Sequence, residues 1–138
     1  MGKVIGFGDF LLRLSPPGYL RFIQADRMDV NYTGAEANVL VSLAIMGLET
    51  EFVTRLPRND IAAAGVAMLR KFGVGVGRIA WGGSRMGVFY LEKGAAQRPS
   101  KVVYDRQGTA IAEATMGDFD SILVVTSLSK QHFSNRNI

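Results

Sequence analysis

Short apolar runs, separated by turns that contain glycine or proline, make up most of this chain. Their lengths and their alternation of apolar and polar positions predict strands. The predicted strands and extended pieces are 3–7, 11–14, 22–25, 28–32, 51–56, 87–92, 101–105 and 121–126. The run 3–7 is nearly all apolar and is expected to be buried. The pair 87–92 and 101–105, joined by a polar loop, predicts a hairpin.

Two segments have a helical pattern. Residues 39–46 are almost continuously apolar, which predicts a helix that packs against a sheet and ends at Gly47. A second helix is predicted over 61–72, with Asn59 or Asp60 as its N-terminal cap. Its apolar face is expected to consist of Ile61, Ala64, Met68 and Phe72.

The order of these elements predicts an α/β fold, because helices alternate with buried strands. Two groups of extended pieces, at about 11–33 and 86–107, interrupt that alternation. They predict a small accessory sheet beside the main one, such as a lid over a cleft. We expect one domain over 1–126, followed by a polar and aperiodic tail over 127–138.

Composition narrows the classes of function. The chain has 138 residues, no cysteine and a formal net charge of +4. Its length suits one domain, and the lack of cysteine excludes disulfides and fits a cytoplasmic location. The basic residues are scattered, which argues against a nucleic-acid partner and fits a modest preference for anionic small molecules. No apolar run is long enough to predict a membrane span, and the N-terminus lacks the pattern of a signal peptide.

The stretch from Tyr32 to Asn38 joins a glycine turn to the start of a helix. A helix start presents unpaired N–H groups and a partial positive charge. Gly34 lets a ligand approach the main chain, and the amide of Asn38 offers a donor and an acceptor for the hydroxyls of a small polar molecule. An ordinary strand–loop–helix junction has the same features. Asp9, at the end of the first strand, is likewise either a ligand-binding residue or a simple turn residue.

Several motifs together resemble the ribokinase/PfkB family of sugar kinases, and most closely its 2-keto-3-deoxygluconate kinase branch. The matching segments, which lie between about residues 3 and 123, are 8–9, 13–16, 34–39, 53–60, 69–74, 87–90 and 103–106. The resemblance implies the N-terminal part of a doubly wound α/β sheet with a small β-sheet lid. It also implies a cytoplasmic transferase that moves the γ-phosphoryl group of ATP to a sugar hydroxyl.

The resemblance implies seven substrate-binding residues in two groups. The residues expected at the sugar hydroxyls are Asp9, Gly34, Ala35 and Asn38, and those expected to close over the sugar from the lid are Phe89, Tyr104 and Arg106. A keto sugar acid carries a carboxylate, which arginine binds through two parallel hydrogen bonds. Tyr104 and Arg106 share a strand face, since side chains alternate. A surface arginine is the alternative for Arg106.

The chain departs from the family pattern at four positions. Thr33 stands where the motif usually begins with a glycine, and Leu40 stands where a small residue is usual. Pro57 replaces a frequent glycine, and Phe89 replaces a tyrosine whose hydroxyl is common. These differences bear on the packing of the first helix and on one polar contact to the sugar.

A larger departure concerns the catalytic segment. The family's ATP site and catalytic base lie in a C-terminal Asp-Thr-x-Gly-Ala-Gly-Asp segment, and the 138 residues contain no such segment. We therefore expect no catalytic residue, no site for ATP and Mg²⁺, and no phosphoryl transfer by this chain alone, as for a truncated or divergent family member. Asp118 and Asp120 do not form a substitute, and the single His132 cannot build a metal site by itself.

Three functional hypotheses follow from the sequence. The first is the sugar-binding half of a 2-keto-3-deoxygluconate kinase or a kinase of a related sugar. The second is a non-catalytic sugar-binding or assembly module, with the lid sheet as the interface of a homodimer, because an unpaired sheet edge invites association. The third is a poorly folded remnant without function.

Overall fold

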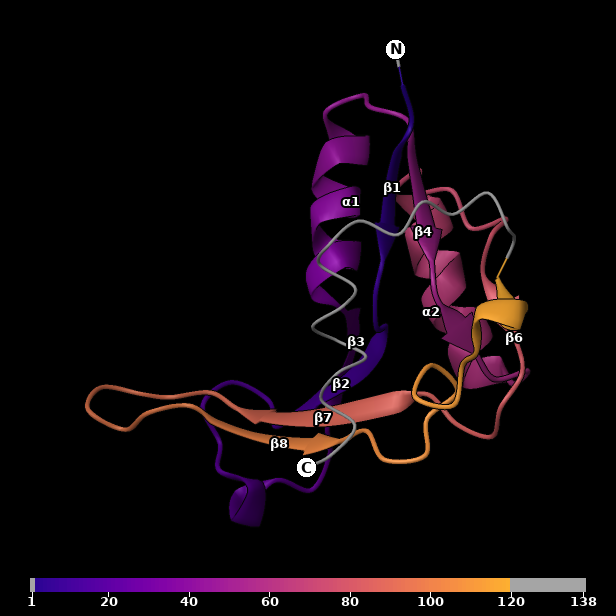
Figure 1. Ribbon diagram of the computed structural model, residues 1–138. Coiled ribbons are helices and arrows are strands. Elements are labelled where there is room, and N and C mark those ends of the chain that lie inside the picture. Colours follow the sequence, from indigo (N-terminus) through magenta and orange to yellow (C-terminus); the bar gives the residue numbers. More distant parts are fainter. Residues whose placement is uncertain (1, 120–138) are drawn as a thin grey trace.

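The computed structural model describes residues 2–119, which build an α/β layer and a separate four-stranded sheet that lies across one end of it (Figure 1). The elements are β1 Val4–Phe7, β2 Leu11–Ser15, η1 Phe22–Gln24, β3 Asp29–Thr33, α1 Ala35–Ile45, β4 Thr50–Val53, β5 Arg55–Leu56, α2 Asp60–Lys71, β6 Ala80–Trp81, β7 Gly87–Glu92, β8 Lys101–Asp105 and η2 Met116–Asp118. The predicted strand 121–126 and the tail 127–138 lie outside the described residues. No helix within residues 2–119 has the length and hydropathy needed to cross a membrane.

Parallel strands form the α/β layer. β1 pairs with β4, and β5 pairs with β6, both in parallel. The N–H of Gly75 donates to the carbonyl of Thr50, and the carbonyl of Gly75 accepts from Phe52 N. A third stretch of chain, around Gly75, therefore runs alongside β4. Helix α1 connects β1 to β4 by way of the accessory sheet, and α2 connects β5 to β6. The predicted α/β fold is confirmed, although the strand expected over 51–56 is split at Thr54.

One apolar core holds both helices to the strands. It combines small and branched side chains of α1 and α2 with apolar side chains of the strands and of the loops beside them. Its members are Phe10, Ala37, Leu40, Phe52, Leu56, Ala62, Val66, Leu69, Val74, Ile79 and Met86. Residues 109–119 pack over the other side of the strands, where Arg55 donates to the carbonyl of Ala110 and the ring of Phe119 meets Phe7 edge-on.

The accessory sheet has the strand order β3-β2-β7-β8. β2 pairs with β7 in parallel, whereas β3 and β8 are antiparallel to their neighbours. Its strands come from the two segments that the sequence sets apart from the α/β alternation, so the small extra sheet is confirmed as part of the fold. The domain boundary at 126 stays a prediction, because it lies beyond the described residues.

The register gives the accessory sheet two different faces, because directly opposed residues project to the same side. One row across the four strands contains Asn31, Arg13, Phe89 and Tyr104. We call this side the arginine face. The row next to it, on the opposite side, contains Val30, Leu14, Tyr90 and Val103. We call that side the apolar face.

An aromatic stack joins the accessory sheet to the α/β layer. Phe10 is fully buried, and its ring stacks on Tyr32 with centroids 5.9 Å apart and meets Phe52 edge-on at 5.7 Å. The hydroxyl of Tyr32 donates to the carbonyl of Ile61 on α2. Gly65 of α2 lies directly beneath both rings, so the two layers meet where the helix has no side chain.

The face of α2 that packs into the core differs from the prediction. Ala62, Gly65, Val66 and Leu69 are buried, whereas Ile61 and Phe72 of the expected face are exposed and Met68 is half-buried. The prediction followed the largest apolar side chains. The helix instead approaches the sheet with its smallest ones, because Phe10 and Tyr32 occupy the space. The predicted Asn59 cap is confirmed, since its side chain accepts from Ala62 N at 2.9 Å.

Two further expectations are wrong. Residues 22–25 are not extended: η1 forms there, because Gln24 N donates to the carbonyl of Arg21 and the Gln24 side chain accepts from Arg21 N. The first strand is not buried, since Val4 and Ile5 are exposed. A short apolar run predicts a strand but does not show whether other elements bury both faces of that strand.

Replacing Gly65 with alanine tests the joint between the two layers. The new Cβ would lie 2.7–2.9 Å from ring atoms of Tyr32 and Phe10, which is closer than real Cβ atoms approach a neighbour. We expect Gly65→Ala to lower the free energy of unfolding by about 1–3 kcal/mol, as overpacking does. Urea denaturation followed by circular dichroism measures this change.

This expected loss of stability is opposite in sign to the change that helix propensity predicts for glycine to alanine. In an unobstructed helix, glycine to alanine adds about 1 kcal/mol of stability. Ala63→Gly, on the exposed side of the same helix, measures that propensity alone. A Gly65→Ala variant more stable than the wild type would contradict the joint described here.

Candidate functional site

The glycine turn lies between the end of β3 and the start of α1, and the structure shows why glycine stands at its centre. Gly34 is buried and its φ is 178°, an extended backbone that any residue adopts. A Cβ at this position would collide with the main-chain oxygen of Asp9. Gly34 is therefore required by the close approach of two backbone segments, which brings Asp9 and Gly34 together.

The neighbouring Asn38 lies in the first turn of α1 and is exposed. The Thr33 hydroxyl lies 3.0 Å from its Nδ2 and 3.2 Å from its Oδ1. Thr33 is one of the departures from the expected motif, and here its hydroxyl holds the amide of Asn38 in place. Ala35, the first residue of α1, is also exposed beside this turn.

Glu36 adds an acidic group that the sequence analysis did not place in the site. Its carboxylate lies against Gly8, where any side chain would collide with it. Gly8 and Glu36 therefore form a second close contact beside Asp9 and Gly34. A carboxylate in the first turn also interacts favourably with the N-terminal end of the helix dipole. The presence of Gly8 one residue before Asp9 was the only sequence signal for this packing.

The second group of predicted residues lies on the hairpin of β7 and β8. Phe89 and Tyr104 are directly opposed, and their ring centroids are 5.6 Å apart. The Arg106 guanidinium carbon lies 4.4 Å from the centre of the Tyr104 ring. A Cβ on Gly87 would come within 3.3 Å of Arg106 Cγ, so the stem of Arg106 lies over this glycine.

Stacking on Tyr104 leaves the guanidinium of Arg106 without a carboxylate partner among the residues that the structure describes. Both side chains are exposed. Aromatic stacking restrains a planar guanidinium but does not use its hydrogen-bond donors. The hairpin therefore presents a restrained cation with donors available to an anionic ligand.

The two groups lie at the same end of the accessory sheet but on different strands. Thr33, Leu11 and Gly87 are aligned in register, and the stem of Arg106, the residue that follows β8, lies over Gly87. Three strand spacings therefore separate the glycine turn from Arg106, which corresponds to roughly 14 Å between their backbones. The arginine face spans the distance between them.

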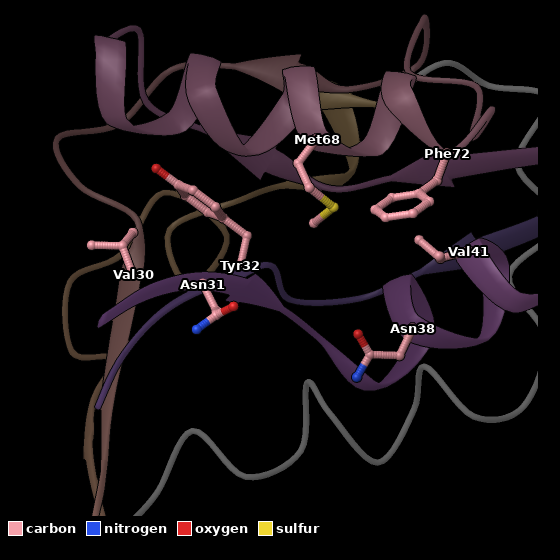
Figure 2. Close-up of a pocket in the computed structure, with 7 residues that line it drawn as sticks. All are labelled: Val30, Asn31, Tyr32, Asn38, Val41, Met68 and Phe72. Atoms are coloured by element: carbon pink, nitrogen blue, oxygen red, sulfur yellow. The ribbon is translucent and has the colours of Figure 1, made fainter. Parts of the chain in front are cut away.

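A cavity of about 370 Å³ lies at the edge strand β3, between α1 and α2. Its lining residues are Val30, Asn31, Tyr32, Asn38, Val41, Met68 and Phe72. Figure 2 shows the amides of Asn31 and Asn38 directed to one side, away from the apolar side chains. Asn38 is the one predicted site residue in this cavity, so the cavity does not unite the turn with the hairpin.

Burial also raises the pKa of Tyr32 above its ordinary value of 10.0. The phenol is therefore neutral at physiological pH and donates its proton to the carbonyl of Ile61 at 2.8 Å. Tyr32 is a structural residue of the cavity wall in this arrangement. Within residues 2–119, no three histidine, cysteine, aspartate or glutamate side chains are grouped so that they could hold a metal ion.

Comparison with known proteins identifies similar sequences and structures. A 2-dehydro-3-deoxygalactonokinase of Haloferax volcanii is 33% identical over 113 residues, which are 81% of this chain and 35% of that protein. The crystal structure of 2-dehydro-3-deoxygluconokinase from Thermotoga maritima has a TM-score of 0.84 and 57% identity, over 86% of this chain and 36% of that one. No family model matches the chain.

A second similar structure is that of a PfkB family carbohydrate kinase from Listeria grayi. It has a TM-score of 0.83 and 36% identity over 86% of this chain and 37% of the other. The chain thus spans about a third of the length of the relatives that it matches.

Replacing Gly34 with alanine tests the close approach of the turn to Asp9. The added Cβ has no room, because a backbone oxygen rather than a flexible side chain blocks it. We expect Gly34→Ala to lower the free energy of unfolding by about 1–3 kcal/mol in a urea titration. Gly77→Ala is the matched control, since the nearest atom to its new Cβ is 3.8 Å away. If Gly34→Ala were as stable as Gly77→Ala, the added Cβ would have room at Gly34, and the close approach to Asp9 described here would be wrong.

Proposed function

Because this chain corresponds in sequence and fold to the N-terminal part of PfkB carbohydrate kinases, we propose that it forms the sugar-binding part of such a kinase. The substrate that we propose is 2-keto-3-deoxygluconate or a closely related sugar acid. The 57% identical relative from Thermotoga maritima carries the name of a kinase for this acid, which supports the choice. Since the chain spans only about a third of its relatives, the activity of a complete enzyme is part of the proposal.

The pairing of Tyr104 with Arg106 is the structural observation that supports an acidic sugar best. The guanidinium lies over the ring at 4.4 Å and is exposed. A carboxylate accepts two parallel hydrogen bonds from such a guanidinium, whereas a neutral hydroxyl accepts one weaker bond. The sugar ring or chain would lie against Phe89 and Tyr104, whose rings form one surface.

The glycine turn supplies the hydroxyl-binding side in this proposal. Asn38 offers both a donor and an acceptor, and Thr33 fixes its orientation. Gly34 and Ala35 lie at the start of α1, where backbone N–H groups lack intrahelical partners. Asp9 adds a carboxylate, which accepts hydrogen bonds from sugar hydroxyls.

ATP is the phosphoryl donor that we propose for the complete enzyme, with Mg²⁺ to offset the charge of its phosphates. The residues of this chain do not fit a site for ATP and Mg²⁺. The sequence contains no Asp-Thr-x-Gly-Ala-Gly-Asp segment, and the described residues form no acidic metal cluster. We therefore propose that this chain binds the sugar acid and that phosphoryl transfer requires residues outside it.

Isothermal titration calorimetry with 2-keto-3-deoxygluconate tests the proposal. We expect the wild type to bind the acid and Arg106→Gln to bind it about 10–100-fold more weakly, as for loss of a charge-assisted hydrogen bond. Arg70→Gln removes an equal charge from an exposed position at the end of α2 and serves as the control. A wild type that binds no sugar acid would refute the proposal.

A non-catalytic assembly role is a second candidate, and the apolar face of the accessory sheet favours it. Val30 and Val103, at its two edges, are 59% and 53% exposed, and Leu14 and Tyr90 between them are half-buried. A contiguous apolar row of this kind is typical of an interaction surface. We propose that a second copy of the chain covers it.

Sedimentation velocity separates this candidate from a monomeric sugar-binding protein. We expect the wild type to sediment as a dimer and Val103→Lys to shift it to the monomer, because a buried ammonium without a partner opposes association. Val102→Lys is the matched control, since this neighbouring exposed residue lies on the opposite face. A wild type that stays monomeric at high concentration argues against assembly.

A further inference from the structure

Arg13 lies on the arginine face, one row further along the sheet than Thr33, Leu11 and Gly87. It is directly opposed to Asn31 on β3 and to Phe89 on β7. Asn31 and Asn38 line the same cavity, and Phe89 stacks on Tyr104. A ligand that lies against the rings of Phe89 and Tyr104 would therefore lie beside Arg13.

The side chain of Arg13 has a buried donor that nothing in residues 2–119 satisfies. Its Nε is inaccessible to solvent and has no hydrogen-bond acceptor among the described residues. Buried donors are nearly always paired, because an unpaired one has lost its hydration without a replacement. The guanidinium of Arg13 is therefore not satisfied within the described residues, and its outer nitrogens, which are not among the buried unpaired atoms, are the donors that a ligand can reach.

The charges around Arg13 favour an anionic acceptor. Arg106 lies on the same face, two strands away, and neither arginine is ion-paired among the described residues. Asp29 is the acidic residue on this face of β3, and it is opposed to Ser15 rather than to Arg13. Two guanidinium groups on one face, without a facing carboxylate, produce a positive potential between them.

We propose that Arg13 is a further substrate-binding residue, whose outer guanidinium nitrogens donate to the carboxylate end of the sugar acid and so set the preference for acidic over neutral sugars. Arg106 and Arg13 would hold the acid end together, and the glycine turn would hold the hydroxyls. This inference rests on the proposed function, because it assigns a residue to the same site. In the sequence, position 13 belongs to the matching segment 13–16, but the resemblance assigns it no role in binding.

Nuclear magnetic resonance of the arginine Nε–Hε groups tests the contact, because an anion bound at the outer nitrogens shifts the signal of the same guanidinium. We expect the Arg13 signal to shift when 2-keto-3-deoxygluconate is added to the wild type, and to stay in place when the uncharged sugar 2-deoxyglucose is added at the same concentration. Arg13→Lys assigns the signal by removing it. A signal that does not respond to the bound acid would overturn the inference.

Calorimetry of three variants measures how much Arg13 contributes to the affinity for the sugar acid. We expect Arg13→Gln to weaken binding of the acid about tenfold, which is the effect of one charge-assisted hydrogen bond. Arg13→Lys keeps the charge but not the planar guanidinium, so we expect it to restore part of the affinity. Arg70→Gln should change nothing. Thermal unfolding of each variant shows whether the fold is intact.

The outcomes separate this inference from the proposed function. If the wild type binds the acid, Arg106→Gln weakens it and Arg13→Gln does not, Arg13 has no role in binding while the proposed function stands. If Arg13→Gln weakens acidic and neutral sugars equally and lowers the melting temperature, Arg13 is a structural residue and the inference fails. If the wild type binds no sugar acid, the proposed function fails and this inference fails with it.

Discussion

The contact of Phe10 and Tyr32 with Gly65 is the constraint on which the arrangement of the molecule depends. At this contact the accessory sheet packs closely against the α/β layer. Phe10 follows Asp9 directly, and Tyr32 precedes Thr33 and Gly34. The same aromatic stack therefore fixes both chain segments that build the glycine turn. A displacement of either ring would separate Asp9 from Gly34, because their backbones approach too closely to tolerate even one additional carbon atom.

The two halves of the candidate site are held by different forces. The glycine turn is fixed by steric fit within the core, whereas the hairpin is fixed by strand register and by stacking of Phe89, Tyr104 and Arg106. The hairpin is also the more exposed of the two, since every residue of β8 is exposed. We expect from this contrast a rigid hydroxyl-binding side and a more adaptable acid-binding side.

The sequence predicted those features that arise from local chemistry. The Asn59 cap, the helix stop at Gly47 with its positive φ, and the hairpin all depend on residues close in the chain. The buried face of α2 could not be predicted this way, since it depends on where the distant rings of Phe10 and Tyr32 lie. Arg13 was missed for a related reason: its neighbours Asn31 and Phe89 come from two other strands. Periodicity assigned it correctly to a strand but could not show what opposes it.

The parallel pairing of β2 with β7 has a consequence for the order in which the molecule folds. These two strands are separated in sequence by α1, α2 and the strands of the α/β layer, so their contact closes a very long loop of chain. Closing such a loop is entropically costly until the intervening segments are compact, and contacts of this range slow folding. The accessory sheet is therefore expected to assemble last, on a preformed α/β layer. On a ribosome, the surface that carries Arg13 and Arg106 would come into being only after residue 106 has emerged, when most of the rest of the described chain is already in place.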